Sequence, residues 1–230
     1  MYSKITHTIV EEHFGHPTAT NIKKSVDKNP PPKPKLIYST PDKFRADVTT
    51  YMTQYINGIN RVINSVTGTD SEMTSAEEAV FKNIDSLGDL MIDIYPAPVR
   101  ENVNQAMRAA ALAMIQTVHL MRSGLDIRDW TNNRFNNLIS NDLAQTLSAI
   151  NNVWSWTTVR DTMNAMTGAW VAQAKARLAK NSVVEQQQQA KSLDTAKLFA
   201  KVFADGVIHQ HPEAFLPPPT MTVSTNRDIM

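Results

Sequence analysis

Apolar residues recur three and four positions apart over most of this chain, and this spacing constrains the fold more than any other feature. A first series begins after Thr40-Pro41-Asp42, where a capping threonine and an early proline indicate a helix start. It continues along one helix face through Phe44, Val48, Tyr51, Tyr55, Ile59, Val62 and Val66. The spacing predicts a single helix of about seven turns.

Two more helices are predicted directly after the first. Ser75 and Glu78 have the capping-box spacing, so we expect a second helix from Ser75 that ends before Pro96. A third runs from Pro98 to Gly124. Consecutive helices with short connections pack as antiparallel neighbours. We therefore expect one core shared by residues Phe44, Tyr55, Ile59, Val80, Ile84, Leu87, Met107, Met114 and Val118.

The helical pattern is looser after Gly124 but continues. We expect a short helix around residues 130–139, another from Asn141, a corner at Trp154-Ser155-Trp156, and a helix from Thr157 or Thr158 to about Glu185. Residues 186–191 are polar, which leaves two alternatives, a solvated helical bridge or a joint before the last apolar series. Only 7 glycines are present, and they are dispersed, so few sites for tight hairpin turns exist. The sequence predicts an all-α fold, a helical bundle of about five to seven helices.

Proline-rich segments flank this helical body. We divide the chain into an N-terminal segment with an extended arm (1–40), the helical body (41–207) and an extended C-terminal tail (208–230). Consecutive prolines exclude helix and favour an extended path, which suits an arm laid across a neighbouring molecule. A plain linker is the alternative. If the segments are arms, their apolar residues are the expected contacts between subunits, namely Leu36, Ile37, Tyr38, Phe215 and Leu216.

No catalytic pattern is found in the sequence. Cysteine is absent, and the glycines form neither a dinucleotide-binding nor a phosphate-binding loop. The six histidines, His7, His13, His16, His119, His209 and His211, lack the spacing of a metal site. The N-terminus has no apolar signal region, and no apolar run is long enough to span a bilayer. We expect no enzyme, cofactor, small-molecule substrate or membrane partner.

Charged residues indicate two candidate contact surfaces. Asp85, Asp89 and Asp93 share one helix face, which is either a solvated face or a site for a cation or basic partner. A second candidate is a basic region with interspersed tryptophan and asparagine residues, which is the chemistry of RNA or DNA contact. Its arginines are Arg100, Arg108, Arg122, Arg128, Arg134 and Arg160. The alternative is that the tryptophans belong to the core.

The order of arm, helical body and tail resembles the layout of coat and nucleocapsid subunits of filamentous or helical viruses. It is also similar to some accessory subunits of large organelle complexes, and no family motif separates the two. Net charge alternates in sign between successive parts of the chain, as complementary contacts between copies would require. We expect a self-assembling structural subunit, located in a virion or the cytoplasm, with an accessory subunit of a hetero-oligomeric complex as the alternative.

Overall fold

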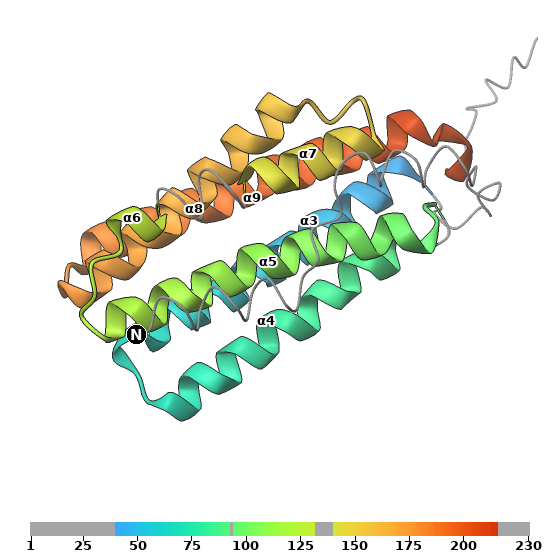
Figure 1. Cartoon of the computed structure of the whole chain (residues 1–230). Coiled ribbons are helices and arrows are strands. Elements are labelled where there is room, and N and C mark those ends of the chain that lie inside the picture. Colours follow the sequence, from blue (N-terminus) through green and yellow to red (C-terminus); the bar gives the residue numbers. More distant parts are fainter. Residues whose placement is uncertain (1–39, 93, 132–139, 216–230) are drawn as a thin grey trace, which may run out of the picture.

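The computed structural model describes residues 40–92, 94–131 and 140–215, which form an elongated bundle of helices with no strand among them (Figure 1). The predicted all-α bundle is thus confirmed. The long helices are α3 (Pro41–Asn64), α4 (Asp70–Leu90), α5 (Ala97–Arg122), α8 (Trp156–Leu178) and α9 (Ser182–Gln210). The shorter ones are η1 (Ser65–Thr67), α6 (Arg128–Trp130), α7 (Ser140–Ile150) and η3 (Pro212–Ala214). Over the described residues, no helix has the length and apolar character needed to cross a membrane.

Local signals fix several helix ends where the sequence predicts them. The hydroxyl of Thr40 accepts a hydrogen bond from the Lys43 N–H at 3.1 Å, which caps α3 directly before Pro41. At the end of α5, Gly124 has a φ of +70°, and the Leu125 N–H bonds to the Leu120 carbonyl at 3.1 Å. This left-handed glycine cap closes the helix.

The start of α4 differs from the prediction. The helix begins at Asp70, because Thr69 and Glu72 form the capping box that the sequence analysis assigns to Ser75 and Glu78. The Thr69 N–H donates to Glu72 Oε2 at 2.7 Å, and the Glu72 N–H donates to Thr69 Oγ1 at 3.3 Å. The earlier start adds Met73, only 2% exposed, to the buried face of α4.

The long helix predicted to reach about Glu185 is two helices. Lys180 adopts a left-handed conformation with φ of 55°, and the side chain of Asn181 caps α9 by accepting from the Val184 N–H at 3.2 Å. The chain reverses here, so α8 and α9 form an antiparallel hairpin (Figure 1). Residues 186–191 lie inside α9, so this polar segment is a helical bridge and not a joint.

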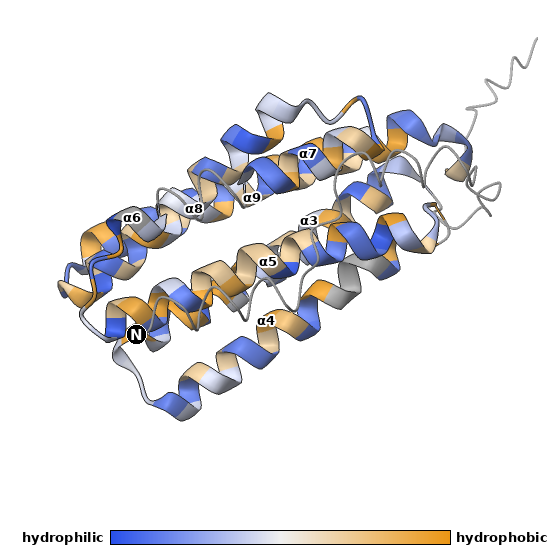
Figure 2. Cartoon of the chain, viewed as in Figure 1, coloured by the Kyte–Doolittle hydropathy of each residue, from blue (hydrophilic) through white to orange (hydrophobic). Residues whose placement is uncertain are grey.

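One core runs through the bundle. Figure 2 shows hydrophobic and hydrophilic residues alternating along each long helix, as helices with one buried face require. Each member of the predicted core is buried in a single cluster, except that the side chain of Leu87 lies outside the described residues. Trp154 and Trp170 are 1% and 0% exposed, so these tryptophans belong to the core.

The two ends of the described chain meet at one end of the bundle. The rings of Phe44 near the start of α3 and Phe215 after η3 have centroids 5.5 Å apart, and Arg45 Nε donates to Asp205 Oδ1 at 2.8 Å. Phe215 is only 6% exposed, so it packs in the core of its own chain and is not free to anchor the tail on a neighbour. The helical body also continues past residue 207, because α9 ends at Gln210 and η3 follows.

Candidate functional site

Four of the six arginines of the basic region, Arg108, Arg122, Arg128 and Arg160, contact other groups of the chain. Arg122 donates to the Gly68 carbonyl at 3.2 Å and to Asp70 at 2.7 Å, and Arg128 pairs with Asp126. The guanidinium of Arg108 lies 5.8 Å from the ring centroid of Phe81.

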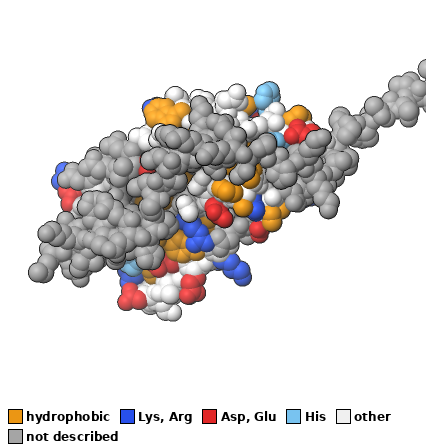
Figure 3. Space-filling model, turned by 45° about the vertical axis from the view of Figure 1, so that its right-hand side comes forward, with side chains coloured by type: hydrophobic (Ala, Val, Ile, Leu, Met, Phe, Trp, Pro, Cys, Tyr) orange, Lys and Arg blue, Asp and Glu red, His pale blue; other side chains and the backbone are white. Residues whose placement is uncertain are grey.

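The other three arginines of the basic region lie at separate positions. Arg160 pairs with Asp161 and lies over the ring of Trp156, 4.4 Å from its centroid. Arg100 is half-buried, and Arg134 lies outside the described residues. Arg100 and Arg122 are at opposite ends of α5, about 33 Å apart along the helix. On the face shown in Figure 3, basic side chains lie scattered among acidic ones. The five predicted arginines that the structure describes therefore do not form one cluster.

The aspartates predicted to share one helix face and the histidines do not form a shared site among the described residues. Asp89 is exposed on α4, while Asp93 and the side chain of Asp85 lie outside the described residues. His119 Nε2 is 3.0 Å from Glu77 Oε1 at the surface, and His211 is buried with Nδ1 3.3 Å from Glu213. Among the described residues, no group of three or more potential metal ligands is assembled.

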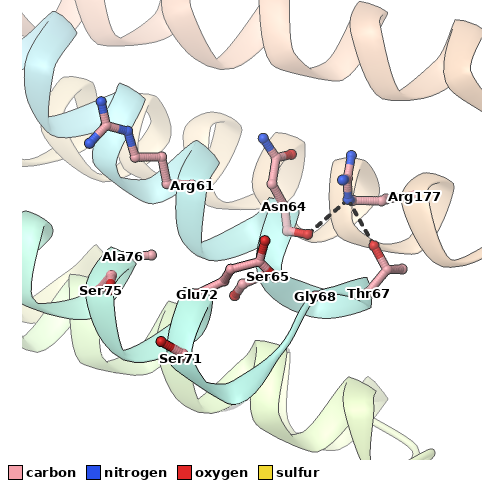
Figure 4. A pocket seen from close by; sticks show the side chains of 10 residues that line it. All are labelled: Arg61, Asn64, Ser65, Thr67, Gly68, Ser71, Glu72, Ser75, Ala76 and Arg177. Carbon is pink, nitrogen blue, oxygen red and sulfur yellow. Dashed lines mark hydrogen bonds between the residues drawn. The ribbon is translucent and has the colours of Figure 1, made fainter.

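A pocket that the sequence analysis does not anticipate lies where α3, η1 and α4 meet the end of α8 (Figure 4). Its volume is about 590 Å³, the size of a small-ligand site. Polar groups dominate the lining, which consists of Arg61, Asn64, Ser65, Thr67, Gly68, Ser71, Glu72, Ser75, Ala76 and Arg177.

Arg177 of α8 connects the pocket to the end of α3 and to α9. Its Nε donates to the Asn64 carbonyl at 3.0 Å and to Thr67 Oγ1 at 3.3 Å, so α8 is tied to the end of α3 (Figure 4). Its Nη1 donates to Glu185 on α9 at 2.8 Å. The Nη2 group makes no hydrogen bond to a described residue, which leaves part of the guanidinium available for a ligand.

Arg61 is the second cation of the pocket and is not neutralised within the described part of the chain. It is exposed, and its guanidinium forms no ion pair or hydrogen bond with a described residue. The hydroxyl groups of Ser71 and Ser75 on α4 are likewise exposed, without a hydrogen-bond partner among the described residues. Together with Nη2 of Arg177, the pocket thus offers donors from three helices, α3, α4 and α8.

One carboxylate, that of Glu72, lies between the two arginines in Figure 4. The hydrogen bond from the Thr69 backbone N–H, followed by that from its hydroxyl, lowers the pKa of Glu72, which stays ionised at neutral pH. Gly68 allows this approach, because a Cβ at that position would lie 2.6 Å from Glu72 Oε2. The pocket therefore combines cationic donors with one fixed anionic acceptor.

Comparison with known proteins adds no relative to this description. No family model matches the chain, and neither a curated protein nor a solved structure matches it.

The residues of the pocket carry only a partial signal in the sequence. The spacing of Thr69 and Glu72 with a preceding glycine locates the corner between α3 and α4. Nothing in the sequence pairs that corner with Arg177, because the contact depends on how α8 packs against α3. The anchors Leu36, Ile37, Tyr38 and Leu216 lie outside the described residues.

Proposed function

We propose that this protein is a non-enzymatic structural subunit that assembles head to tail, of the kind that forms the coat or nucleocapsid of a filamentous virus. One observation carries the proposal. The segments that flank the body leave it together at one end, and exposed apolar side chains lie at the opposite end.

The exit end is defined by direct contacts. The described chain starts at Thr40 and ends at Phe215, and Phe215 packs on Phe44 of α3 with ring centroids 5.5 Å apart. The N-terminal segment of 39 residues and the C-terminal segment of 15 residues therefore begin close to one another. Contacts made by either segment near its root are concentrated at this end.

The far end carries three exposed apolar residues, which we call the far-end patch. Leu178 closes α8 and Val183 opens α9, with exposed fractions of 41% and 64%. Leu125, 54% exposed, follows the end of α5. Arg122 at the end of α5 donates to the Gly68 carbonyl, and Arg177 near the end of α8 donates to the Asn64 carbonyl, so both helices end around the same corner of the chain.

Chain length excludes contact between the arm anchors and the far-end patch of the same molecule. Leu36 is four residues from Thr40, so it reaches about 14 Å from the exit point at most. The 29-residue helix α9 connects the two ends and is about 43 Å long. Leu36, Ile37 and Tyr38 can therefore meet a far-end patch only on a second copy of the chain.

Such a contact generates a chain of subunits. The exit end of one copy faces the far end of the next, so the interface is heterologous and repeats without closing unless the rotation forms a ring. Each fully buried apolar side chain contributes about 1.5–3 kcal/mol, and this contribution recurs at every interface. Ile92, in the turn between α4 and α5, is exposed at the exit end itself, and Trp156 and Leu198 are exposed on other parts of the surface.

Truncation and substitution of the arm test the proposal. We expect deletion of residues 1–39 to leave helicity and melting temperature unchanged and to abolish assembly measured by light scattering and electron microscopy. The full chain with Leu36, Ile37 and Tyr38 all changed to serine should behave in the same way. A chain with Lys33→Ser and Lys35→Ser is the matched control and should assemble.

Two outcomes would contradict the proposal. Normal assembly of the truncated chain would show that the arm is a dispensable linker. A full-length chain that stays monomeric would rule out self-assembly and favour the second hypothesis, an accessory subunit of a hetero-oligomeric complex.

A further inference from the structure

We propose that residues 216–226 of the C-terminal segment pack on an exposed apolar surface of their own chain, formed by Val153 and Trp156. We call these two residues the corner patch, because they lie at the corner between α7 and α8. The anchors in the segment are Met221 and Val223. This inference goes beyond the proposed function, which assigns a binding site to the N-terminal arm and none to the C-terminal segment.

The corner patch is the exposed side of a loop that buried contacts hold on α9. Its two residues are 40% and 39% exposed. Between them in the chain, the indole of Trp154 stacks on Phe203 with centroids 4.8 Å apart and donates to the Phe203 carbonyl at 3.1 Å. The Asn151 side chain donates to the Gly206 carbonyl at 2.8 Å. The corner is therefore fixed beside the last turns of α9 (Figure 1).

Trp156 presents more surface to solvent than the other tryptophans that the structure describes. Trp154 and Trp170 are buried, and Trp130 is partly buried. The guanidinium of Arg160 lies over the Trp156 ring, 4.4 Å from its centroid, and 39% of the tryptophan is exposed in spite of this contact. The exposed part of the ring is suited to an apolar partner.

The C-terminal segment starts within reach of the corner patch. It follows Phe215, which is five residues after Gln210, and the Gln210 side chain donates to the Ile150 carbonyl at 3.2 Å. The corner patch begins three residues after Ile150. An extended chain spans about 3.4 Å per residue, so Met221 reaches about 20 Å and Val223 about 27 Å from Phe215.

The sequence of the segment matches an apolar surface. No charged residue occurs between Glu213 and Arg227. Three consecutive prolines, residues 217–219, favour an extended path, which lowers the entropy lost on docking. Residues 220–224 alternate hydroxyl and apolar side chains, so their two apolar residues share one side of an extended chain. One of them is a methionine, whose sulfur makes favourable contacts with aromatic rings.

Tethering favours the segment of the same chain over that of another copy. A short tether holds the segment at an effective concentration of about millimolar, which exceeds the concentration of other copies in dilute solution. The N-terminal arm is less suited to the corner patch. Its anchors follow Lys33 and Lys35, whereas the C-terminal segment is neutral as far as Asn226.

A double-mutant cycle in the full chain tests the contact, with melting followed by circular dichroism below the concentration at which the chain assembles. We expect Val153→Ser to lower the melting temperature by about 2–4 °C, because it removes a covered apolar side chain. In a chain with Met221→Ser and Val223→Ser, the same substitution should cause no further loss. The matched control is Leu198→Ser, at a 52% exposed position on α9, and its melting temperature should stay within about 1 °C of the parent.

Fluorescence reports the cover on Trp156 directly. Acrylamide should quench the chain with Met221→Ser and Val223→Ser more strongly than the parent. This difference should disappear when both chains also carry Trp156→Phe. Equal quenching of the two chains, equal melting of the Val153→Ser and Leu198→Ser chains, or additive losses in the cycle would each overturn the inference.

A disulfide test separates the chain's own segment from that of a second copy. The chain has no cysteine, so Val153→Cys combined with Val223→Cys supplies the only two thiols. We expect oxidation to give a cross-linked monomer on a non-reducing gel, and a cross-linked dimer would overturn the inference and assign the corner patch to another copy. Assembly of the Val153→Ser chain should be normal in light scattering, and its loss would also overturn the inference. A parent chain that never assembles refutes the proposed function and leaves the cycle unaffected.

Discussion

Substitution of Gly206 by alanine tests the packing of the bundle at the exit end. Gly206 lies in α9 under the indole of Trp154, and a Cβ at this position would be 1.9 Å from Trp154 Nε1. The indole is 1% exposed, is stacked on Phe203 with centroids 4.8 Å apart, and donates to the Phe203 carbonyl at 3.1 Å. The added methyl group therefore cannot be accommodated unless Trp154 moves.

The expected cost follows from three contributions. Overpacking a close-packed core costs about 1–3 kcal/mol. Displacement of the indole leaves a buried donor unsatisfied, which costs about 1–3 kcal/mol. Alanine offsets about 1 kcal/mol of this through its better helix propensity. We expect Gly206→Ala to lower the free energy of unfolding by about 3 kcal/mol, or the melting temperature by about 6–12 °C.

Gly168→Ala is the matched control for this substitution. Gly168 lies in α8, and a Cβ there would meet nothing within 4 Å, so only the helix propensity changes. We expect this variant to be more stable than the parent by about 0.5–1 kcal/mol. Urea unfolding followed by circular dichroism measures both variants. A Gly206→Ala chain as stable as the Gly168→Ala chain would refute the described packing of Trp154 on α9.

Three other substitutions test separate parts of the fold. Ile84→Ala should destabilise the chain by about 2–5 kcal/mol in urea unfolding, since Ile84 is 0% exposed, and an unchanged midpoint would contradict its burial. Phe215→Ala should cost about 3 kcal/mol and loosen the exit end around Phe44, whereas no loss of stability would mean that Phe215 is free to contact a neighbour. The hydrogen bonds from Arg128 lower the pKa of Asp126 from 3.8 to about 2, so NMR titration should find a midpoint near that value. Because the folded pKa is the lower one, the stabilisation is present above 3.8 and is lost as the pH falls towards 2, and Arg128→Ala should move the midpoint back up.

Helix existence and most helix ends could be predicted because their signals are local. Thr40 followed by proline, and a glycine in the left-handed conformation after α5, act within one turn of the chain. The apolar spacing also identified the core, since a helix buries its apolar face wherever it packs.

Helix ends were predicted wrongly where two local signals competed. Both Ser75 with Glu78 and Thr69 with Glu72 have capping-box spacing, and only the position of Met73 in the core favours the earlier pair. The break between α8 and α9 contains neither glycine nor proline, so no residue of the sequence marks the end of α8. Lys180 supplies the left-handed residue that such a turn requires, which sequence propensity disfavours.

The pocket could not be predicted, because its two arginines come from distant parts of the chain. Arg61 and Arg177 line opposite sides of the pocket because α8 packs against α3 and η1, which no local pattern encodes (Figure 4). The arginines that the sequence favoured were grouped by closeness along the chain. In the structure, Arg100 and Arg122 lie at opposite ends of the 26-residue helix α5, and Arg160 lies on a different helix, α8.

The head-to-tail interface is tested most directly by mixing two variants that each lack one half of it. The first has Leu36, Ile37 and Tyr38 changed to serine, so it keeps the far-end patch and loses the arm anchors. The second has the far-end patch residues Leu125, Leu178 and Val183 changed to serine, so it keeps the arm and loses the site that binds the arm of another copy. Light scattering of each variant and of the mixture, at concentrations where the unmodified chain assembles, measures the mass of the particles.

A heterologous interface predicts one specific result. Each variant alone should be a monomer of about the chain mass of 25.7 kDa. The mixture should form a heterodimer of twice that mass and stop, because only one of the two interfaces can form. A mixture that stays monomeric, or single variants that still assemble, would contradict the proposal that the arm of one copy binds the far end of the next.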